Sequence, residues 1–292
     1  MKPLYLKKHT RTDRYSFSFR HVSVPHMYDK FHYHEEIELN TVISGKGTRF
    51  IGNSIEPFDG KDLVMVGPNL PHVWVNDRIY YKGYADLKAE VINILFLNTF
   101  LGENFLHLPE MHPLKKLFDR SGRGVVFYGN TRERVIEQLI RLSTYNESDR
   151  LVGFIQVLNM LAQSTECEEL LTSNFSNHRE PKDIERINRV YQYIFEHFTN
   201  KINLEDVAKI ACMHPSAFCR YFKKITKKTF NEFLTEIRIN YACKLLLDEE
   251  FNITQIAFEC GFNNPALFFR KFKSITGYTP KTYKKIREKI IF

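Results

Sequence analysis

The sequence of 292 residues lacks the features that mark several common classes of protein. Its five cysteines are odd in number and include no C-x-x-C pair, which indicates reduced thiols rather than a disulfide framework. No apolar run approaches the length of a membrane span, and the first ten residues lack the apolar core of a signal peptide. We therefore expect a cytoplasmic protein that has no membrane partner.

Signs of catalysis are equally scarce. The sequence contains no Ser/His/Asp set and no glycine loop of the kind that cradles phosphate, so we expect that the protein is not an enzyme. Hydrophobic residues make up 43% of the chain, which excludes a disordered protein, and the length suffices for two domains.

The net positive charge lies in one part of the chain. Residues 184–292 contain 19 Lys and Arg against 11 Asp and Glu, whereas residues 1–183 contain 23 of each kind. The whole excess of +8 therefore lies in the C-terminal part. A basic region beside a neutral one is typical of a nucleic-acid-binding module attached to another domain.

One pattern occurs twice in this basic part. Asn203–Thr226 has the sequence N-L-E-D-V-A-K-I-A-C-M-H-P-S-A-F-C-R-Y-F-K-K-I-T, and Asn252–Thr276 has N-I-T-Q-I-A-F-E-C-G-F-N-N-P-A-L-F-F-R-K-F-K-S-I-T. Matching positions are 49 residues apart before the central turn and 50 apart after it, so the second turn has one more residue. Repetition at this spacing indicates a duplicated supersecondary unit.

Each copy predicts a helix, a turn and a second helix. A proline, Pro215 or Pro265, suits the first turn of the second helix, where a missing N–H costs nothing. Phenylalanines at i and i+4 of that helix should face inward and leave arginine and lysine outside. One such helix is as compatible with an ordinary solvated face as with a binding surface. Two copies with matching Arg and Lys positions favour DNA binding.

These residues resemble the DNA-binding domain of AraC-type transcriptional regulators, over about 100 residues from Ile184. The second copy, followed by T-G-Y-T-P-K-T-Y, carries the more specific part of the likeness. The joining segment F-L-T-E-I-R-I-N-Y-A-C-K-L-L is similar to the family's long connecting helix, with Arg238 in place. Cys212 stands where the family usually has glycine, so we expect backbone strain in the first turn.

The resemblance implies that outward side chains near the start of each second helix contact bases. Arg220 and Arg270 can each bind guanine through two hydrogen bonds, whereas Asn264 can equally serve as a helix cap. The expected base contacts are Ser216, Ala217, Cys219, Arg220, Asn264, Pro265, Ala266, Phe269 and Arg270. The expected phosphate contacts are Lys223, Lys224, Lys271, Lys273 and Lys281.

The N-terminal part up to about residue 108 predicts short strands between closely spaced turns, as in an antiparallel barrel or sandwich. In F-H-Y-H-E-E-I-E-L, the side chains of His32, His34 and Glu38 share one parity and should project from one face. This segment resembles the first motif of cupins, and His72 with Asn76 resembles the second.

Three imidazoles and a carboxylate, from His32, His34, Glu38 and His72, could hold a divalent transition metal. The same residues are compatible with a polar interior that binds an effector, or with polar side chains that only satisfy one another. We expect no resident cofactor and substoichiometric metal in purified protein. Trp74, the only tryptophan, could form the floor of a pocket for a sugar effector or could be a core residue.

A helical period follows the strands, from Thr131 to Leu171, with one apolar stripe in each of two helices. These helices resemble the dimerisation pair of the family, although they could instead both pack on the barrel as a lid. The polar, proline-containing segment Thr172–Asp183 predicts a linker.

The sequence thus predicts an α+β protein of two domains. Residues 1–171 would form a cupin-like antiparallel β-barrel with two C-terminal helices, and residues 184–292 an all-α domain of two helix-turn-helix units joined by a long helix. Function would be effector-responsive regulation of transcription, with activation expected and repression left open, by a homodimer that binds double-stranded DNA, RNA polymerase and a small-molecule effector. The alternatives are a cupin-type metalloenzyme with a DNA-binding appendage and a constitutive architectural DNA binder.

Overall fold

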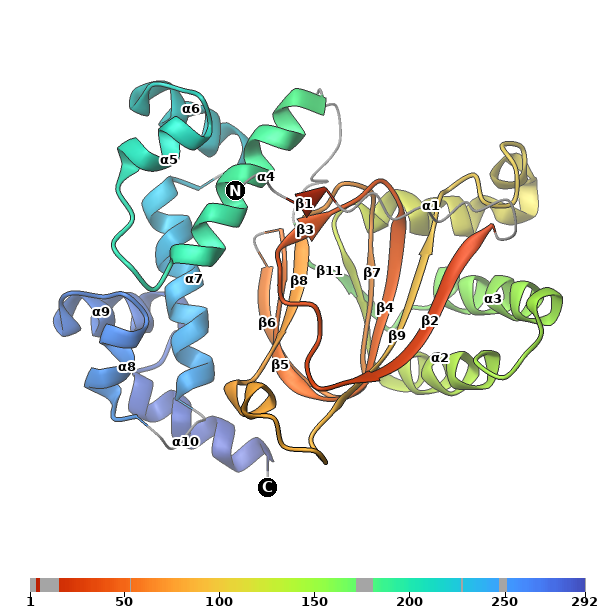
Figure 1. Cartoon of the computed structure of the whole chain (residues 1–292), viewed down its shortest axis with the longest axis horizontal. Helices are drawn as coiled ribbons and strands as arrows, with labels where there is room; N and C mark the ends of the chain where they lie inside the picture. Colours follow the sequence, from red (N-terminus) through yellow and green to blue (C-terminus); the bar gives the residue numbers. More distant parts are fainter. Residues whose placement is uncertain are drawn as a thin grey trace. The chain divides into compact units, whose positions relative to one another are not determined.

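The computed structural model describes residues 4–5, 16–52, 54–171, 181–226, 228–246 and 251–291. The chain divides into two compact units, Leu4–Glu180 and Pro181–Phe292 (Figure 1). Most of the predicted linker, residues 172–180, lies outside the described residues, and residues 181–183 already belong to a helix. Among the helices in the described ranges, none has both the length and the apolar character required to cross a bilayer.

The N-terminal unit contains two sheets whose neighbouring strands are antiparallel, apart from the parallel pair β1 and β3. One sheet has the order β1 (Leu4–Tyr5), β3 (His32–Tyr33), β8 (His72–Asn76), β5 (Lys46–Ile51) and β6 (Ser54–Asp59). The other has the order β11 (Cys167–Glu169), β10 (Val125–Phe127), β7 (Asp62–Val66), β4 (Ile37–Ser44), β9 (Ala89–Phe96) and β2 (Phe17–Val24).

The predicted antiparallel architecture is confirmed, but the hydrogen bonds of the described strands form two sheets rather than one closed barrel. The reason lies in the turns after β4 and β6, where the chain passes from one sheet to the other. Gly45 and Gly60 occupy these turns with φ of 132° and 60°, a region that glycine adopts at low cost.

Three helices cover one face of the six-stranded sheet: α1 (His112–Ser121), α2 (Gly129–Leu142) and α3 (Glu147–Ala162). Alternation along the strands sends one set of apolar residues to this face, whereas the opposite face carries polar side chains such as Glu38 and Asn40 together with apolar ones such as Val64 and Val66. Val135, Leu139, Phe154 and Leu158 of the two predicted apolar stripes are fully buried in the resulting core. Both helices therefore pack on the sheet. Short 3-10 helices occur at η1 (Arg78–Lys82), η2 (Phe105–His107) and η3 (Pro109–Met111).

The predicted helical stretch from 131 to 171 was wrong at its end. α3 stops at Ala162, and residues 167–169 return to the sheet as β11 beside β10. A strand of three residues carries too short a pattern for a period of two to be detected. Its place depends on contacts distant in sequence, because Glu169 accepts hydrogen bonds from Arg120 and Arg123 at 2.8 and 2.9 Å.

The C-terminal unit is entirely helical among its described residues. The pairs α5/α6 and α8/α9 are the two copies of the repeated pattern, and α7 joins them (Figure 1). The helices are α4 (Pro181–His197), α5 (Leu204–Ile210), α6 (Pro215–Thr226), α7 (Phe230–Leu245), α8 (Ile253–Glu259), α9 (Pro265–Thr276) and α10 (Pro280–Ile291).

The two turns have the same geometry despite their different sequences. Cys212 and Gly261 both adopt positive φ, of 54° and 81°. In each turn the following amide bonds back to the small residue of the first helix: Met213 N–H to Ala208 O at 2.9 Å, and the equivalent bond to Ala257 at 3.0 Å. The additional residue of the second copy is inserted after this turn, immediately before α9.

The equivalence continues beyond the repeated sequence. Thr226 Oγ1 lies 2.9 Å from Phe222 O, and Thr276 Oγ1 lies 2.8 Å from the matching carbonyl, so both second helices end in the same way. The first turns of α7 and α10 then pack equivalent aromatic rings against α6 and α9. Phe233 meets α6 with ring centroids 5.4 Å apart, and Tyr283 meets α9 at 5.6 Å.

Cys212→Gly should stabilise the protein by about 1 kcal/mol, because a non-glycine residue in the left-handed region costs roughly 1–2 kcal/mol and the entropy of glycine offsets part of the gain. The Cys212 side chain is exposed, so little packing is lost. Calorimetry of full-length protein measures the change. Gly261→Ala is the matched control and should destabilise, because its Cβ would lie 2.8 Å from the carbonyl oxygens of Phe198 and Thr199. A destabilising Cys212→Gly substitution would contradict the assignment of strain.

Candidate functional site

The second helix of each pair has a buried aromatic face and an exposed face. Phe218 and Phe222 of α6 and Phe268 and Phe272 of α9 are fully buried, as predicted. Their ring centroids are 5.4 Å apart in α6 and 5.6 Å in α9. Residues i and i+4 lie on one side of a helix, so this burial determines which side faces solvent.

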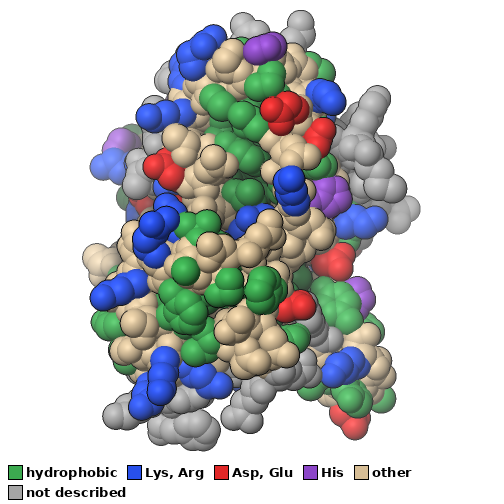
Figure 2. Space-filling model, turned by 90° about the vertical axis from the view of Figure 1, so that its left-hand side faces the viewer, with side chains coloured by type: hydrophobic (Ala, Val, Ile, Leu, Met, Phe, Trp, Pro, Cys, Tyr) green, Lys and Arg blue, Asp and Glu red, His purple; other side chains and the backbone are tan. Residues whose placement is uncertain are grey.

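The predicted base-contact and phosphate-contact residues lie on the solvent side of these helices or at the N-cap of α9, except Lys281, which lies at the start of α10. Figure 2 shows this side of the C-terminal unit, where Lys and Arg side chains surround exposed apolar ones. The exposed members are Ser216, Cys219, Arg220, Lys223, Lys224, Asn264, Ala266, Phe269, Arg270, Lys273 and Lys281, and the half-buried members are Ala217, Pro265 and Lys271.

Asn264 is the N-cap of α9. Its side-chain oxygen accepts hydrogen bonds from Ala266 N–H at 2.8 Å and Leu267 N–H at 3.4 Å. The equivalent position before α6 is His214, whose Nδ1 lies 3.0 Å from Ser216 Oγ. The sequence left open whether Asn264 contacts a base or caps the helix, and the structure contains the capping interaction.

The exposed faces of the two helices differ in chemistry. Leu267 and Phe269 of α9 are 36% and 40% exposed, and they occupy the positions of Ala217 and Cys219 in α6. Leu267 was absent from the predicted contacts. The 50-residue offset that pairs it with Ala217 would have identified it.

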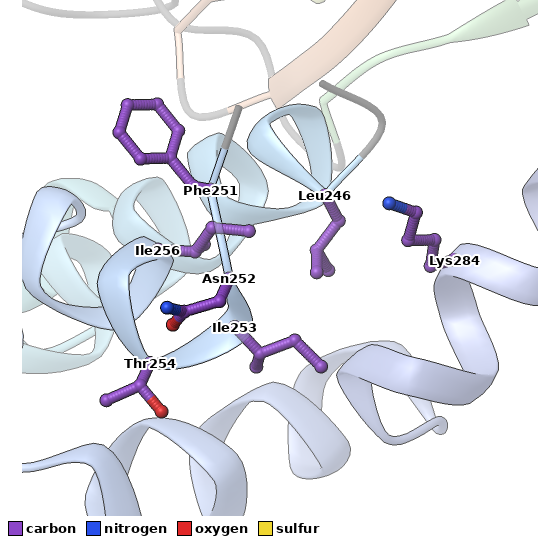
Figure 3. Close-up of a pocket in the computed structure, with 7 residues that line it drawn as sticks. All are labelled: Leu246, Phe251, Asn252, Ile253, Thr254, Ile256 and Lys284. Atoms are coloured by element: carbon purple, nitrogen blue, oxygen red, sulfur yellow. The ribbon is translucent and has the colours of Figure 1, made fainter. Parts of the chain in front are cut away.

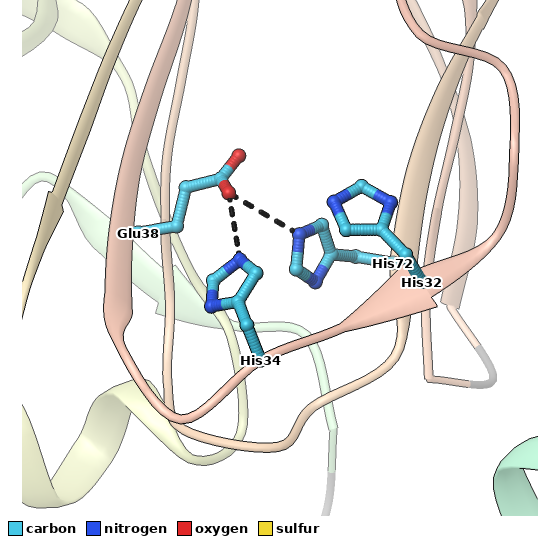
Figure 4. Close-up of side chains that lie close together, drawn as sticks. All are labelled: His32, His34, Glu38 and His72. Carbon is cyan, nitrogen blue, oxygen red and sulfur yellow. Dashed lines mark hydrogen bonds and ion pairs between the residues drawn. The ribbon is translucent and has the colours of Figure 1, made fainter. Parts of the chain in front are cut away.

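In the N-terminal unit, the four predicted ligand residues converge between the two sheets (Figure 4). One potential donor atom from each of His32, His34, Glu38 and His72 lies within 4.8 Å of the others, and all four residues are buried. Glu38 Oε2 lies 3.0 Å from His34 Nε2 and 3.4 Å from His72 Nε2. The pairing of β3 with β8 places His32 directly opposite His72.

Backbone carbonyls determine the orientation of all three imidazoles. The Nδ1 atoms of His32, His34 and His72 lie 2.9, 3.1 and 2.7 Å from the carbonyl oxygens of Lys30, Glu36 and Leu70. A carbonyl only accepts, so Nδ1 carries the proton of each neutral ring and Nε2 presents a lone pair. Three such nitrogens and a carboxylate fit a divalent transition metal, with the carbonyls as outer partners. The same geometry also fits a proton shared between His34 and Glu38.

Trp74, Asp62 and Arg49 form a second buried group beside these residues. The Trp74 side chain is 3% exposed, and its ring meets the His72 ring edge-on. Its indole N–H donates a hydrogen bond to Asp62 Oδ2 at 3.0 Å. Arg49 pairs with Asp62 and Glu56. Burial raises the pKa of Asp62, and the Arg49 guanidinium and the indole N–H oppose that rise. The Trp74 side chain is thus a hydrogen-bonded part of the interior.

Asn76 has a structural position in this unit. Its side chain accepts from Met27 N–H at 2.7 Å and donates to Lys46 O at 3.2 Å, so it joins the segment before β3 to the start of β5.

An open pocket of 610 Å³ lies in the C-terminal unit, between the end of α7, the start of α8 and α10 (Figure 3). Its lining is mostly apolar, with the Lys284 side chain at one side. The lining residues are Leu246, Phe251, Asn252, Ile253, Thr254, Ile256 and Lys284.

Comparison with known proteins identifies the C-terminal unit. Residues 207–286 match a family model described as a helix-turn-helix domain. The uncharacterized HTH-type transcriptional regulator YdeC of Bacillus subtilis is 36% identical over 101 residues, and the match covers 35% of each chain. This chain therefore spans about a third of the length of that relative.

Two further relatives match over most of their length at lower identity. The melibiose operon regulatory protein of Escherichia coli K12 is 21% identical over 295 residues, which cover 97% of this chain and 91% of the relative. The HTH-type transcriptional activator RhaS of Escherichia coli O6:H1 is 23% identical over 265 residues, which cover 88% of each. The C-terminal unit is a helix-turn-helix domain of the AraC type, and the chain is related to DNA-binding regulators of transcription.

Trp74→Phe should lower the free energy of unfolding by about 1–3 kcal/mol, because Asp62 Oδ2 loses a buried hydrogen-bond donor. Urea unfolding followed by circular dichroism measures this loss. A double-mutant cycle with Asp62→Ala isolates the interaction, since alanine offers the indole N–H no acceptor. A coupling energy below about 0.5 kcal/mol would mean that the indole N–H contributes nothing here.

Proposed function

We propose that the protein is an effector-responsive regulator of transcription that binds double-stranded DNA through α6 and α9. One observation carries this proposal: Arg220 and Arg270 are exposed at equivalent positions of two duplicated helix-turn-helix pairs, above equivalent buried phenylalanines. The excess positive charge of residues 184–292 supports the same conclusion, because duplex DNA is recognised first through its phosphates.

The two helices would enter successive major grooves on one side of the DNA, about one helical turn apart. Arg220 and Arg270 would bind guanine edges, and the flanking lysines would bind phosphates. The exposed Ala266, Leu267 and Phe269 of α9 offer no hydrogen bonds, so they would contact thymine methyl groups and sugars.

The N-terminal unit would be the sensor, with a cupin-like arrangement of residues 1–171 followed by a linker at 172–183. Its interior contains the buried polar cluster of His32, His34, Glu38 and His72, which suits a small polar effector. A sugar is the first class to test, since one relative is named for the melibiose operon. Binding would change DNA affinity or contact with RNA polymerase.

A homodimer belongs to the same proposal, but not chiefly through the predicted apolar stripes, because most of their side chains, including Val135, Leu139, Phe154 and Leu158, are buried in the core on the sheet. The outward residues Ile140 and Val152, which are 39% and 57% exposed, are the apolar side chains that α2 and α3 offer to a second copy.

A divalent metal is a second candidate ligand of the sensor. The observation that favours it is the shared orientation of His32, His34 and His72, each with Nδ1 at a carbonyl, together with the Nε2 atoms of His34 and His72 near Glu38. When bound, the metal would join strands of both sheets, because His72 lies in β8 and Glu38 in β4. A ligand that bridges the sheets in this way could change their spacing.

Arg270→Ala should weaken specific DNA binding by roughly 1–3 kcal/mol and relax the preference at one base pair. Lys273→Ala, one turn further along α9, is the matched comparison. It should weaken all duplexes alike and reduce the slope of log affinity against log salt by about 1. Binding of full-length protein to selected and random duplexes measures both effects. If the two variants lose the same affinity on both DNAs, the assignment of bases to Arg270 and phosphate to Lys273 is wrong.

Zn²⁺ or Ni²⁺ added to chelator-treated, tag-free protein should stabilise it by about 2.7 kcal/mol at a hundredfold excess over the dissociation constant. His72→Ala should abolish the stabilisation. His21→Ala is the control, because His21 pairs with Glu90 at 2.8 Å and is not one of the four converging residues. Equal stabilisation of wild type and His72→Ala would show that the metal binds elsewhere.

A further inference from the structure

We propose that Arg238 is a positioning residue that sets the distance and angle between the two DNA-binding helices, α6 and α9. The proposal rests on the proposed function, since it concerns how two helices engage one DNA molecule. It assigns to a residue outside both binding helices the control of which spacing between two half-sites is accepted.

Arg238 lies in the middle of α7 and contacts both halves of the C-terminal unit. Its Nε donates to Phe198 O at 2.7 Å, and its Nη2 donates to Asn200 O at 2.7 Å. The guanidinium also lies 5.8 Å from the centre of the Phe262 ring. One side chain thus joins the segment that leads into the first pair to the turn of the second pair.

The backbone of the same two segments is in close contact. A Cβ at Gly261 would lie 2.8 Å from the carbonyl oxygens of Phe198 and Thr199, so the second turn sits directly against the segment between α4 and α5. The Phe198 ring also meets Tyr241 of α7 edge-on at 5.1 Å. We call the group formed by residues 198–200, Arg238, Tyr241, Gly261 and Phe262 the Arg238 junction.

The chemistry of this junction requires arginine. The planar guanidinium presents several N–H donors in fixed directions, which allows one side chain to serve two carbonyls two residues apart. Lysine would place one ammonium there and could not reproduce that fork. The carbonyls follow the last residue of α4, His197, and a cation is favourable at the negative end of a helix. Burial lowers the pKa of Arg238, consistent with its withdrawal from solvent.

Each helix pair has its own core. Loss of the junction should therefore change the distance and angle between the two pairs without unfolding either of them. The first pair is held by rings of α4, α6 and α7, including Tyr191 and Phe233. The second is held by a separate cluster that contains Ile256, Phe268 and Phe272. Binding through two linked contacts exceeds binding through one only when their geometry allows simultaneous engagement. A loosened junction should therefore weaken the complete site while leaving each half-site unaffected.

The test uses full-length protein, a selected operator, the same operator with one or two base pairs inserted between its half-sites, and each half-site alone. Wild type should lose at least about tenfold in affinity upon insertion. Arg238→Lys should bind the native operator about tenfold more weakly, discriminate less than about threefold between spacings, and bind the half-sites as wild type does. Arg186→Lys is the matched control, because Arg186 is also a partly buried arginine of this unit, bonded to Asp183 at 2.8 Å outside the junction.

A second measurement is independent of DNA. One spin label is attached to Cys219 on α6 and a second to the cysteine introduced on α9 by Phe269→Cys, after the other four cysteines are replaced. The two labels report the distance between the helices. Arg238→Lys should broaden or shift that distance, and Arg186→Lys should not. An unchanged distance, or a spacing preference equal to that of wild type with only lower stability, would overturn the proposal. If wild type bound no duplex specifically, the proposed function would fail while the distance measurement would still decide the role of Arg238.

Discussion

The proposed DNA-binding surface depends on the burial of two phenylalanines, one turn apart, in each of α6 and α9. A helix that buries positions i and i+4 must present position i+2 on its other side. Arg220 and Arg270 follow the first buried ring by two positions, so both project to solvent. The surface requires no preformed cavity. It requires only that the aromatic side of each helix remain packed on α7 or α10, which the equivalent contacts of Phe233 and Tyr283 provide.

Much of this unit could be predicted from sequence because its signals are local. Helical period, the prolines before α6 and α9, and the 49- and 50-residue offsets all lie within short windows. Cys212 was correctly placed at a strained turn, since the repeat aligns it with Gly261. The Arg238 junction could not be predicted in the same way. It joins residues 198–200 to residues 238 and 261, and no periodicity relates those positions.

In the N-terminal unit, too, features set by local sequence could be predicted, and features set by distant contacts could not. The parity of His32, His34 and Glu38 predicted that they share a face, and the structure brings His72 to them across β3 and β8. The orientation of the imidazoles depends on the carbonyls of Lys30, Glu36 and Leu70, which only a folded chain can supply. The same dependence on distant partners explains the error at residues 163–171. β11 forms because it pairs with β10 and because Arg120 and Arg123 donate hydrogen bonds to Glu169, whereas its own three residues carry no strand pattern.

The duplication keeps the two cores alike and lets the two surfaces differ. Ser216, Ala217 and Cys219 of α6 are small, whereas the matching Ala266, Leu267 and Phe269 of α9 are wholly apolar and, at the last two positions, larger. On the proposed function, a single copy would therefore recognise an asymmetric site, with guanine contacts common to both halves and methyl-rich contacts in one. The two ends of an asymmetric site differ, so the protein can bind it in one orientation only if each helix meets its own half-site. A fixed angle between α6 and α9 would ensure this, and it would also fix the orientation of any surface that the protein presents to RNA polymerase.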